Sequence, residues 1–183
     1  MLETERLVLD QWCEADFAPF AQLNADPEVM RYFLAPLSAA ESDALARRIH
    51  NLIVEQGYGF WALRLKETGQ FIGFTGLHHK DGDSGIPNAP LVEIGWRLSA
   101  EFWGKGYAPE AARAALRYAF TTLELGAVYA FTALPNRASR RVMEKIGMVN
   151  TGEDFDHPDL PEGHWLERHC LYRVERDEWL AAC

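Results

Sequence analysis

The stretch EFWGKGYAPEAARAALRYAF, residues 101–120, places two glycines around a lysine just ahead of a proline and an alanine-rich segment. Apolar residues then recur every three or four positions, at Ala108, Ala112, Ala115, Ala119 and Leu123. This spacing predicts a helix with one buried face. Pro109 suits the first turn of such a helix, where a missing N–H costs nothing. The glycines therefore lie just before a helix N-terminus.

A helix N-terminus carries bare N–H groups and roughly half a positive charge, and glycine lets a phosphate approach the backbone closely. The sequence around Gly104 and Gly106 is thus compatible with an anion site or with a turn that holds no ligand. A P-loop does not fit, because Lys105 is followed by Gly106 rather than by Ser or Thr. A dinucleotide fingerprint does not fit either, because Pro109 stands where its third glycine would be.

Composition and charge limit the class of protein. The chain has 183 residues, 48% of them hydrophobic and 25% charged, which is typical of a globular protein. That length suits a single domain covering residues 1–183. The net charge of −9 opposes binding to nucleic acid or to an anionic membrane. An anionic ligand would therefore have to be held by local chemistry.

The cysteines and the N-terminal segment favour a cytoplasmic protein. Cys13, Cys170 and Cys183 show no CxxC spacing, so neither a disulfide framework nor a cysteine zinc site is expected. The segment MLETERLVLDQW lacks a basic start followed by an apolar run, and no stretch approaches the length of about eighteen apolar residues that a membrane span needs. We expect a chain that is neither exported nor inserted into a membrane.

Periodicity and turn residues predict a mixed α/β chain. Strands are expected over 5–12, over two runs around a turn at 67–69, over 91–98, over 128–133 and from 169 onward. Helices are expected as two short pieces within 14–33 separated by Asp26-Pro27, then over 38–55, after 106, and over 136–146. This order favours a mixed sheet covered by helices.

Four motifs carry a resemblance to a known family. The strand LVEIGWRL (91–98), a four-residue link and WGKGYA (103–108) opening a helix resemble the acyl-CoA motif of the GNAT superfamily of N-acetyltransferases. Trp103 departs from the Gln or Arg that begins the general motif. The chain also resembles the RimJ/RimL-like branch in TERLVL (4–9), DPEVMRYF (26–33) and NRASRRVMEKIGM (136–148).

The resemblance implies a fold and a donor. The fold is a central mixed, mostly antiparallel sheet flanked by helices, with a splayed strand pair, and the donor is acetyl-CoA. The pantetheine arm would pair with the backbone of Trp96, Arg97 and Leu98 and with Asn136, whose alternative role as a helix N-cap is compatible. The pyrophosphate would lie on the amides of Trp103, Gly104, Lys105, Gly106, Tyr107 and Ala108.

Acyl transfer needs a base for the attacking amine and a hydrogen-bond donor for the leaving thiolate. Strand alternation puts Glu93 on one face with Gly95 and Arg97, and the resemblance implies that this face looks into the acceptor cleft. Glu93 is the candidate base, directly or through water; its alternative is a solvated glutamate. Ser139, three residues after Asn136 on the same helix face, is the candidate donor, although Ser is common in a first turn.

Several residues remain weaker candidates. Phe33, Trp61 and His78 are candidates for lining the acceptor pocket, but aromatic residues of this kind are more often core. The histidines match none of the usual metal-ligand spacings, so no metal is expected.

The leading hypothesis is an N-acetyltransferase that moves an acetyl group from acetyl-CoA to a primary amine by direct attack in a ternary complex. The acceptor would be a small molecule or a peptide N-terminus, since an α-amine has a lower reference pKa than a lysine side chain. Neither nucleic acid nor membrane is expected as a partner, and a homodimer stays open. The alternative is a non-catalytic acyl-CoA-binding sensor.

Overall fold

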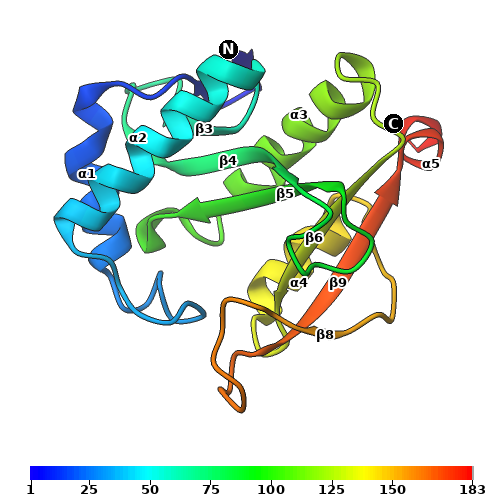
Figure 1. Cartoon of the computed structure of the whole chain (residues 1–183). Coiled ribbons are helices and arrows are strands. Elements are labelled where there is room, and N and C mark those ends of the chain that lie inside the picture. The colour runs from blue at the N-terminus through cyan, green and yellow to red at the C-terminus, as the bar shows by residue number, and fades with distance from the viewer. Residues whose placement is uncertain (183) are drawn as a thin grey trace. The chain divides into compact units, whose positions relative to one another are not determined.

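The computed structural model describes residues 1–182 of the chain, which divide into two compact units. The first unit comprises residues 1–77 and 95–115, and the second comprises residues 78–94 and the chain from 116 onward. Two strands and one helix contain residues of both units. Figure 1 labels the helices and strands along the chain. Each unit is described on its own.

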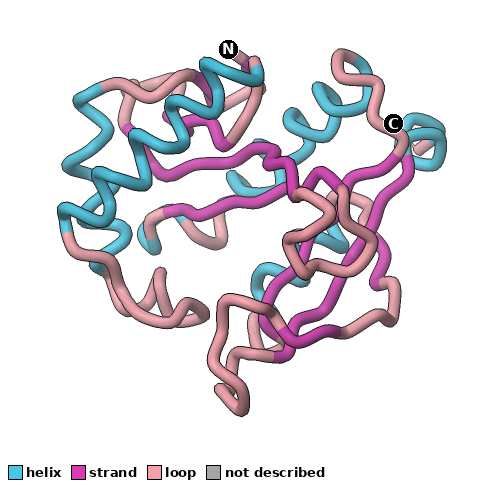
Figure 2. Tube along the Cα trace, in the orientation of Figure 1, coloured by secondary structure: helices cyan, strands magenta, loops and turns pink. Residues whose placement is uncertain are grey.

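A sheet with the strand order β1-β2-β3-β4-β5 forms the first unit (Figure 2). Its strands are β1 (Leu2–Glu3), β2 (Leu7–Asp10), β3 (Phe60–Leu65), β4 (Phe71–Lys80) and β5 (Leu91–Leu98), the last two continuing in the second unit. β1 to β4 pair in antiparallel fashion, with Leu9 opposite Leu63 in the register of β2 and β3. The unit also contains η1 (Glu14–Asp16), α1 (Phe17–Ala25), α2 (Ala39–Gln56), η2 (Ala100–Phe102) and the start of α3 (Tyr107–Thr121).

Aromatic side chains fill the core of the first unit. Trp12 lies edge-on to Phe20 of α1, with ring centroids 4.8 Å apart, and 5.5 Å from Phe71 of β4. The indole N–H of Trp12 donates to the Phe60 carbonyl at 2.8 Å, so this buried ring has its polar group satisfied. These contacts fix α1 against β3 and β4.

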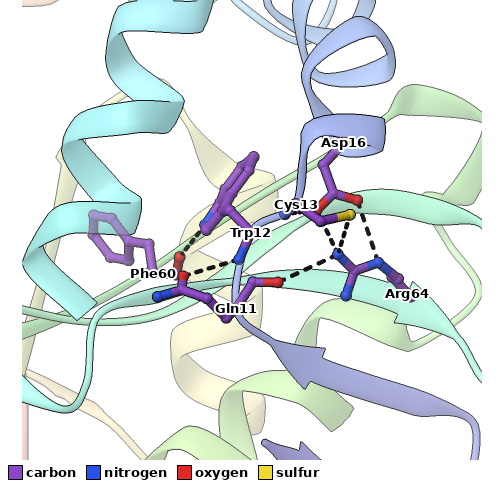
Figure 3. A network of polar contacts seen from close by, with 6 residues as sticks. All are labelled: Gln11, Trp12, Cys13, Asp16, Phe60 and Arg64. Atoms are coloured by element: carbon purple, nitrogen blue, oxygen red, sulfur yellow. Dashed lines mark hydrogen bonds and ion pairs between the residues drawn. The ribbon is translucent and has the colours of Figure 1, made fainter. Parts of the chain in front are cut away.

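A polar network joins η1 to β3 (Figure 3). The Arg64 guanidinium forms a two-pronged ion pair with the buried Asp16 carboxylate and also donates to the Gln11 carbonyl at 3.4 Å. Asp16 in turn accepts from the Cys13 N–H at 2.8 Å. An arginine fork on a carboxylate is the geometry in which a buried charge is best compensated.

A sheet with the strand order β5-β6-β9-β7 forms the second unit, with β8 pairing β9. Its elements are β6 (Ala127–Ala133), α4 (Arg137–Lys145), β7 (Val149–Asn150), β8 (Phe155–Asp156), β9 (Arg168–Glu175) and α5 (Arg176–Ala181). β6 and β9 are antiparallel along seven residue pairs. β5 and β6 are parallel and share the pair Glu93 and Tyr129. Ile86, Leu91, Phe155 and Leu171 form a buried apolar cluster.

The predicted fold class is confirmed: the sheet is mixed, mostly antiparallel and accompanied by helices. β5 pairs with β6 at Glu93 and Tyr129, and its residues from Gly95 to Leu98 belong to the first unit. The predicted N-cap role of Asn136 is confirmed, because its side chain accepts from the Ser139 N–H. Ser38 and Glu41 form a capping box at the start of α2.

The second of the two short helices predicted within 14–33 is wrong, because α1 ends at Ala25 and residues 26–33 form turns. The Asp26 carboxylate accepts from the Glu28 N–H at 2.9 Å, and this local bond competes with a helical arrangement. Pro36 follows soon after and prevents a helix from extending through this segment.

Within residues 1–182, none of the helices is both long and apolar enough to span a bilayer.

Candidate active site

The glycine stretch forms a tight loop that delivers the chain into α3. Gly104 and Gly106 have φ of +74° and +82°, a region that favours glycine. The Glu110 N–H donates to the Gly106 carbonyl at 3.2 Å. The amides from Gly104 to Ala108 make no hydrogen bond within the described chain, as expected ahead of a helix and in its first turn. They present unpaired N–H groups at the positive end of a helix dipole.

The Trp103 amide is excluded from this set, because its N–H already donates to the Ala100 carbonyl at 3.1 Å. The side chain of Trp103 has a different role. Its indole N–H donates to the Leu98 carbonyl at 2.9 Å, while the ring is 45% exposed. This bond joins the start of the loop to the end of β5. The sequence assigns no role to the Trp103 side chain, because nothing local indicates a bond across five residues.

Two residues that the sequence analysis missed fasten the loop to the N-terminal segment. Arg6 donates through Nε to Glu110 Oε2 at 2.7 Å and through Nη1 to the Lys105 carbonyl at 3.0 Å. Its guanidinium lies 4.5 Å from the centre of the Tyr107 ring. Arg6 belongs to the TERLVL motif, but its partners lie about a hundred residues away in sequence. We call Arg6 and Glu110 the loop brace.

Hydrogen bonding keeps Glu110 of the loop brace ionised. Burial opposes the charged form, but hydrogen bonds from Thr4 and Arg6 outweigh it and lower the pKa of the Glu110 carboxyl. The Thr4 hydroxyl donates to Glu110 Oε1 at 2.6 Å, and the Arg6 backbone N–H donates to the same oxygen at 2.9 Å. The brace is thus a charge-assisted network rather than a single contact.

The three residues predicted to pair with pantetheine, Trp96, Arg97 and Leu98, lie at the end of β5 in the first unit. A Cβ on Gly73 would lie 2.1 Å from the Arg97 carbonyl, so the backbones of β4 and β5 approach closely because residue 73 is glycine. The Leu98 carbonyl already accepts from Trp103. A second bond to that oxygen would use its other lone pair.

Glu93 lies in a cluster of ionisable side chains in the second unit. Its Oε1 is 3.2 Å from His78 Nδ1 and 3.5 Å from Lys80 Nζ, and the Glu93 side chain is 13% exposed. His78 and Lys80 alternate along β4, so they lie on the same face of that strand. The structure thus brings together the predicted base and the predicted pocket residue His78. Lys80 was missed, although its spacing from His78 is the available signal.

Asn136 and Ser139 lie together at the start of α4 in the second unit. The Asn136 amide donates to the Thr132 hydroxyl at 3.0 Å, and its oxygen accepts from the Ser139 N–H at 3.2 Å. The amide retains a second N–H donor. Ser139 is half-buried, and its hydroxyl makes no hydrogen bond within the described residues. The hydroxyl is therefore available as a donor.

The weaker pocket candidates have different surroundings. Trp61 is 4% exposed and is a core residue of the first unit, whereas Phe33 is 45% exposed. The Arg97 guanidinium lies 4.3 Å from the centre of the Phe33 ring. No group of three or more His, Cys, Asp or Glu side chains among residues 1–182 could hold a metal ion.

Comparisons with known proteins agree with this description. Residues 6–149 match the model of the acetyltransferase (GNAT) domain. The chain is 32% identical over 166 residues to the FsC-acetyl coenzyme A-N(2)-transacetylase of Aspergillus fumigatus, covering 87% of this chain and 69% of that protein. It is 37% identical over 150 residues to Bacillus subtilis YkkB, covering 80% and 84%. A solved GNAT-family acetyltransferase from Bacillus anthracis matches with a TM-score of 0.80 at 24% identity, covering 96% and 98%.

The chain belongs to the GNAT family of acetyltransferases, because the family model matches well over half of its length. It is an enzyme, an acyl-CoA-dependent N-acetyltransferase, as the sequence motifs predicted. The matched residues come from both units, and they include the loop, the loop brace, Glu93 and Ser139.

Proposed function

We propose that the protein transfers an acetyl group from acetyl-CoA to a primary amine by direct attack in a ternary complex. The observation that carries the proposal is the unpaired amide set from Gly104 to Ala108 at the start of α3, in a chain that belongs to the GNAT family. The alternative of a non-catalytic acyl-CoA sensor gains no support from the family match or from the relative that is named for its activity.

Donor binding is assigned to the loop and to two further segments. The amides of Gly104 to Ala108 bind the pyrophosphate through a helix N-terminus, where two positive-φ glycines keep the backbone open. Lys105 and Tyr107 take part through their backbones. The backbone of Trp96 to Leu98 and the remaining Asn136 N–H bind the pantetheine. Trp103 contributes by its bond to Leu98 rather than by its own amide.

In the chemical step, the amine nitrogen attacks the thioester carbonyl, so that an N–C bond forms and the C–S bond breaks. Glu93 takes the proton that the nitrogen loses, directly or through water, and His78, 3.2 Å away, can pass it on. Ser139 donates to the departing thiolate. A thiol has a reference pKa of about 8.5, so this leaving group needs little more than a hydrogen bond near neutral pH.

The whole chain is assigned a domain, a branch of the family, an acceptor class and a location. We assign residues 1–183 to one acetyltransferase domain of the RimJ/RimL-like branch, on the strength of TERLVL, DPEVMRYF and NRASRRVMEKIGM. The acceptor is a small-molecule or peptide amine, the location is the cytoplasm, and no metal or nucleic acid takes part. A homodimer is the assembly to be examined by sedimentation.

The loop brace makes a prediction about donor affinity. Replacing Arg6 by Ala removes the side-chain bonds to Glu110 and to the Lys105 carbonyl, so the amides lose part of what fixes their arrangement. We expect the KM for acetyl-CoA to rise about tenfold, the cost of about one charged hydrogen bond. Lys66→Ala, which breaks the partly exposed pair with Glu3, is the matched control and leaves that KM unchanged. An unchanged KM for acetyl-CoA in Arg6→Ala would show that the loop brace does not contribute to donor binding.

The activity itself is tested by release of coenzyme A thiol from acetyl-CoA with a panel of amino acids, peptides, polyamines and aminoglycosides. Turnover with at least one amine, together with a mass increase of one acetyl group in that amine, is the expected result. Binding of acetyl-CoA without turnover on any amine would favour the sensor, and absence of both would overturn the proposal.

A further inference from the structure

Arg97 is a half-buried cation in the first unit that lacks a carboxylate partner among residues 1–182. Its Nη1 donates to Asn24 Oδ1 at 2.7 Å, and its guanidinium lies 4.3 Å and 5.2 Å from the centres of the Phe33 and Phe74 rings. The Nε atom is covered and makes no hydrogen bond. Burial lowers the pKa of Arg97 to about 10. The partners of this charge are thus all neutral.

Arg64 of the same unit shows how the chain compensates a comparable charge. It places its guanidinium on the buried Asp16 carboxylate. Buried charges are paired as a rule, because an aromatic face and one amide oxygen only partly replace the lost hydration. Arg97 differs from Arg64, because all of its partners are neutral.

The surroundings of Arg97 are rigid on one side and adjustable on the other. Asn24 is fully buried, and its amide donates to the Ser42 hydroxyl at 2.9 Å, which fixes the oxygen that Arg97 binds. Phe33 covers another side of the guanidinium but is 45% exposed and lies in the turns of residues 26–33. Movement of this one exposed ring would open the face of the guanidinium that it now covers, beside the unsatisfied Nε.

That edge has the geometry for one kind of ligand. Nε and Nη2 carry parallel N–H groups, and neither makes a hydrogen bond within the described chain. Two parallel donors match the two oxygens of a carboxylate. The buried Phe74 ring, 5.2 Å from the guanidinium, packs against Phe60 with ring centroids 5.1 Å apart. The site thus combines an anion-binding fork with an aromatic backing.

We propose that Arg97 binds a carboxylate of the amine acceptor, so that the acceptors are amino acids or short peptides with a free carboxylate; this inference rests on the proposed function. Such acceptors are zwitterions, so the net charge of −9 does not repel them as it would an anion. Arg97 is a specificity-determining residue, whereas its backbone serves the donor.

The test compares each acceptor of a panel of L-amino acids and dipeptides as the free acid and as the C-terminal amide, in thiol release from acetyl-CoA. We expect the wild-type protein to prefer the free acid by at least tenfold in kcat/KM, because an unpaired fork penalises the amide. Arg97→Gln should abolish this preference and leave the KM for acetyl-CoA within twofold. Arg31→Gln, an exposed arginine stacked on Tyr32 at 5.5 Å, is the matched control and keeps the preference.

Equal use of acids and amides by the wild-type protein would overturn the inference, as would a preference that survives in Arg97→Gln. If Arg97→Gln raises the KM for acetyl-CoA and keeps the preference for the free acid, the Arg97 side chain binds the donor and not the acceptor. If Arg97→Gln does not fold, Arg97→Lys keeps the charge, removes the fork and should lose most of the preference. Titration of each free acid and its C-terminal amide into protein saturated with coenzyme A measures the binding preference even without turnover. A failure of the carboxylate inference can thus be told apart from a failure of the proposed acetyl transfer.

Discussion

Replacing Glu93 by Gln lowers kcat/KM for acetyl transfer by about 10²–10⁴-fold, the usual contribution of a positioned general base. The amide has nearly the same shape but cannot take a proton from the attacking amine. His78 at 3.2 Å and Lys80 at 3.5 Å would still surround residue 93, so the effect should fall on turnover and not on folding. Steady-state kinetics under saturating acetyl-CoA measure it.

The control for this substitution is Glu162→Gln, which removes an exposed carboxylate of the same unit and leaves kcat/KM unchanged. His78→Gln should have an intermediate effect if His78 passes the proton on, because Glu93 itself remains. A Glu93→Gln variant with wild-type turnover would show that another group accepts the proton or that the amine reacts already deprotonated. Unchanged affinity for acetyl-CoA in this variant would confirm that the loss is chemical.

Acid should destabilise the protein through His169, which is 9% exposed in the second unit. Burial lowers the pKa of His169 to about 4, while Nδ1 lies 3.1 Å from the Glu167 carbonyl. The ring of His157 lies 4.7 Å away, and burial lowers the pKa of this histidine as well. Both rings are thus held neutral among the aromatic rings of Phe131 and Phe155.

The direction in which pH changes the free energy of unfolding follows from proton uptake. Between pH 6.5 and 4 the unfolded chain binds a proton at residue 169 and the folded chain does not, so stability falls as the pH falls. At about 1.4 kcal/mol per pKa unit, the loss of unfolding free energy from His169 is about 3 kcal/mol over this range. Urea unfolding at a series of pH values measures it.

The matched comparison is His169→Gln, which should be less stable than the wild type at pH 7 but should show a flatter decline toward pH 4. His50→Gln, at a half-exposed position in the first unit, should retain the wild-type slope. A decline in His169→Gln as steep as that of the wild type would assign the acid sensitivity to other groups.

Local signals explain why much of the fold could be predicted. A few adjacent residues determine each of three features: the period of α3, the Ser38 capping box and the glycine turn between β3 and β4. The helix predicted after Asp26 was wrong, although the residues there have helical spacing. A side-chain bond from Asp26 and the nearby Pro36 outweighed that spacing. β1, β7 and β8 have two residues each, too few to show a period.

The site was predictable only in part, because its contacts are long-range. The loop and the Asn136 cap could be placed from sequence, since each depends on neighbours. The bond of Arg6 to Glu110 joins residues that are 104 positions apart, and no local pattern links them. The pairing of Glu93 with Lys80 likewise depends on which strands pair and on which faces meet. The same holds for the absence of a carboxylate beside Arg97 among residues 1–182.

The central claim is that the α3 loop binds acetyl-CoA, and calorimetric titration of acetyl-CoA into the protein tests it most directly. We predict saturable binding at one site per chain, with affinity reduced at least tenfold in Gly106→Val, where the positive φ of +82° disfavours a branched side chain and a Cβ would lie 3.4 Å from Arg6 Nη2. Absence of binding to the folded wild-type protein, or equal affinity in a folded Gly106→Val variant, would contradict the account.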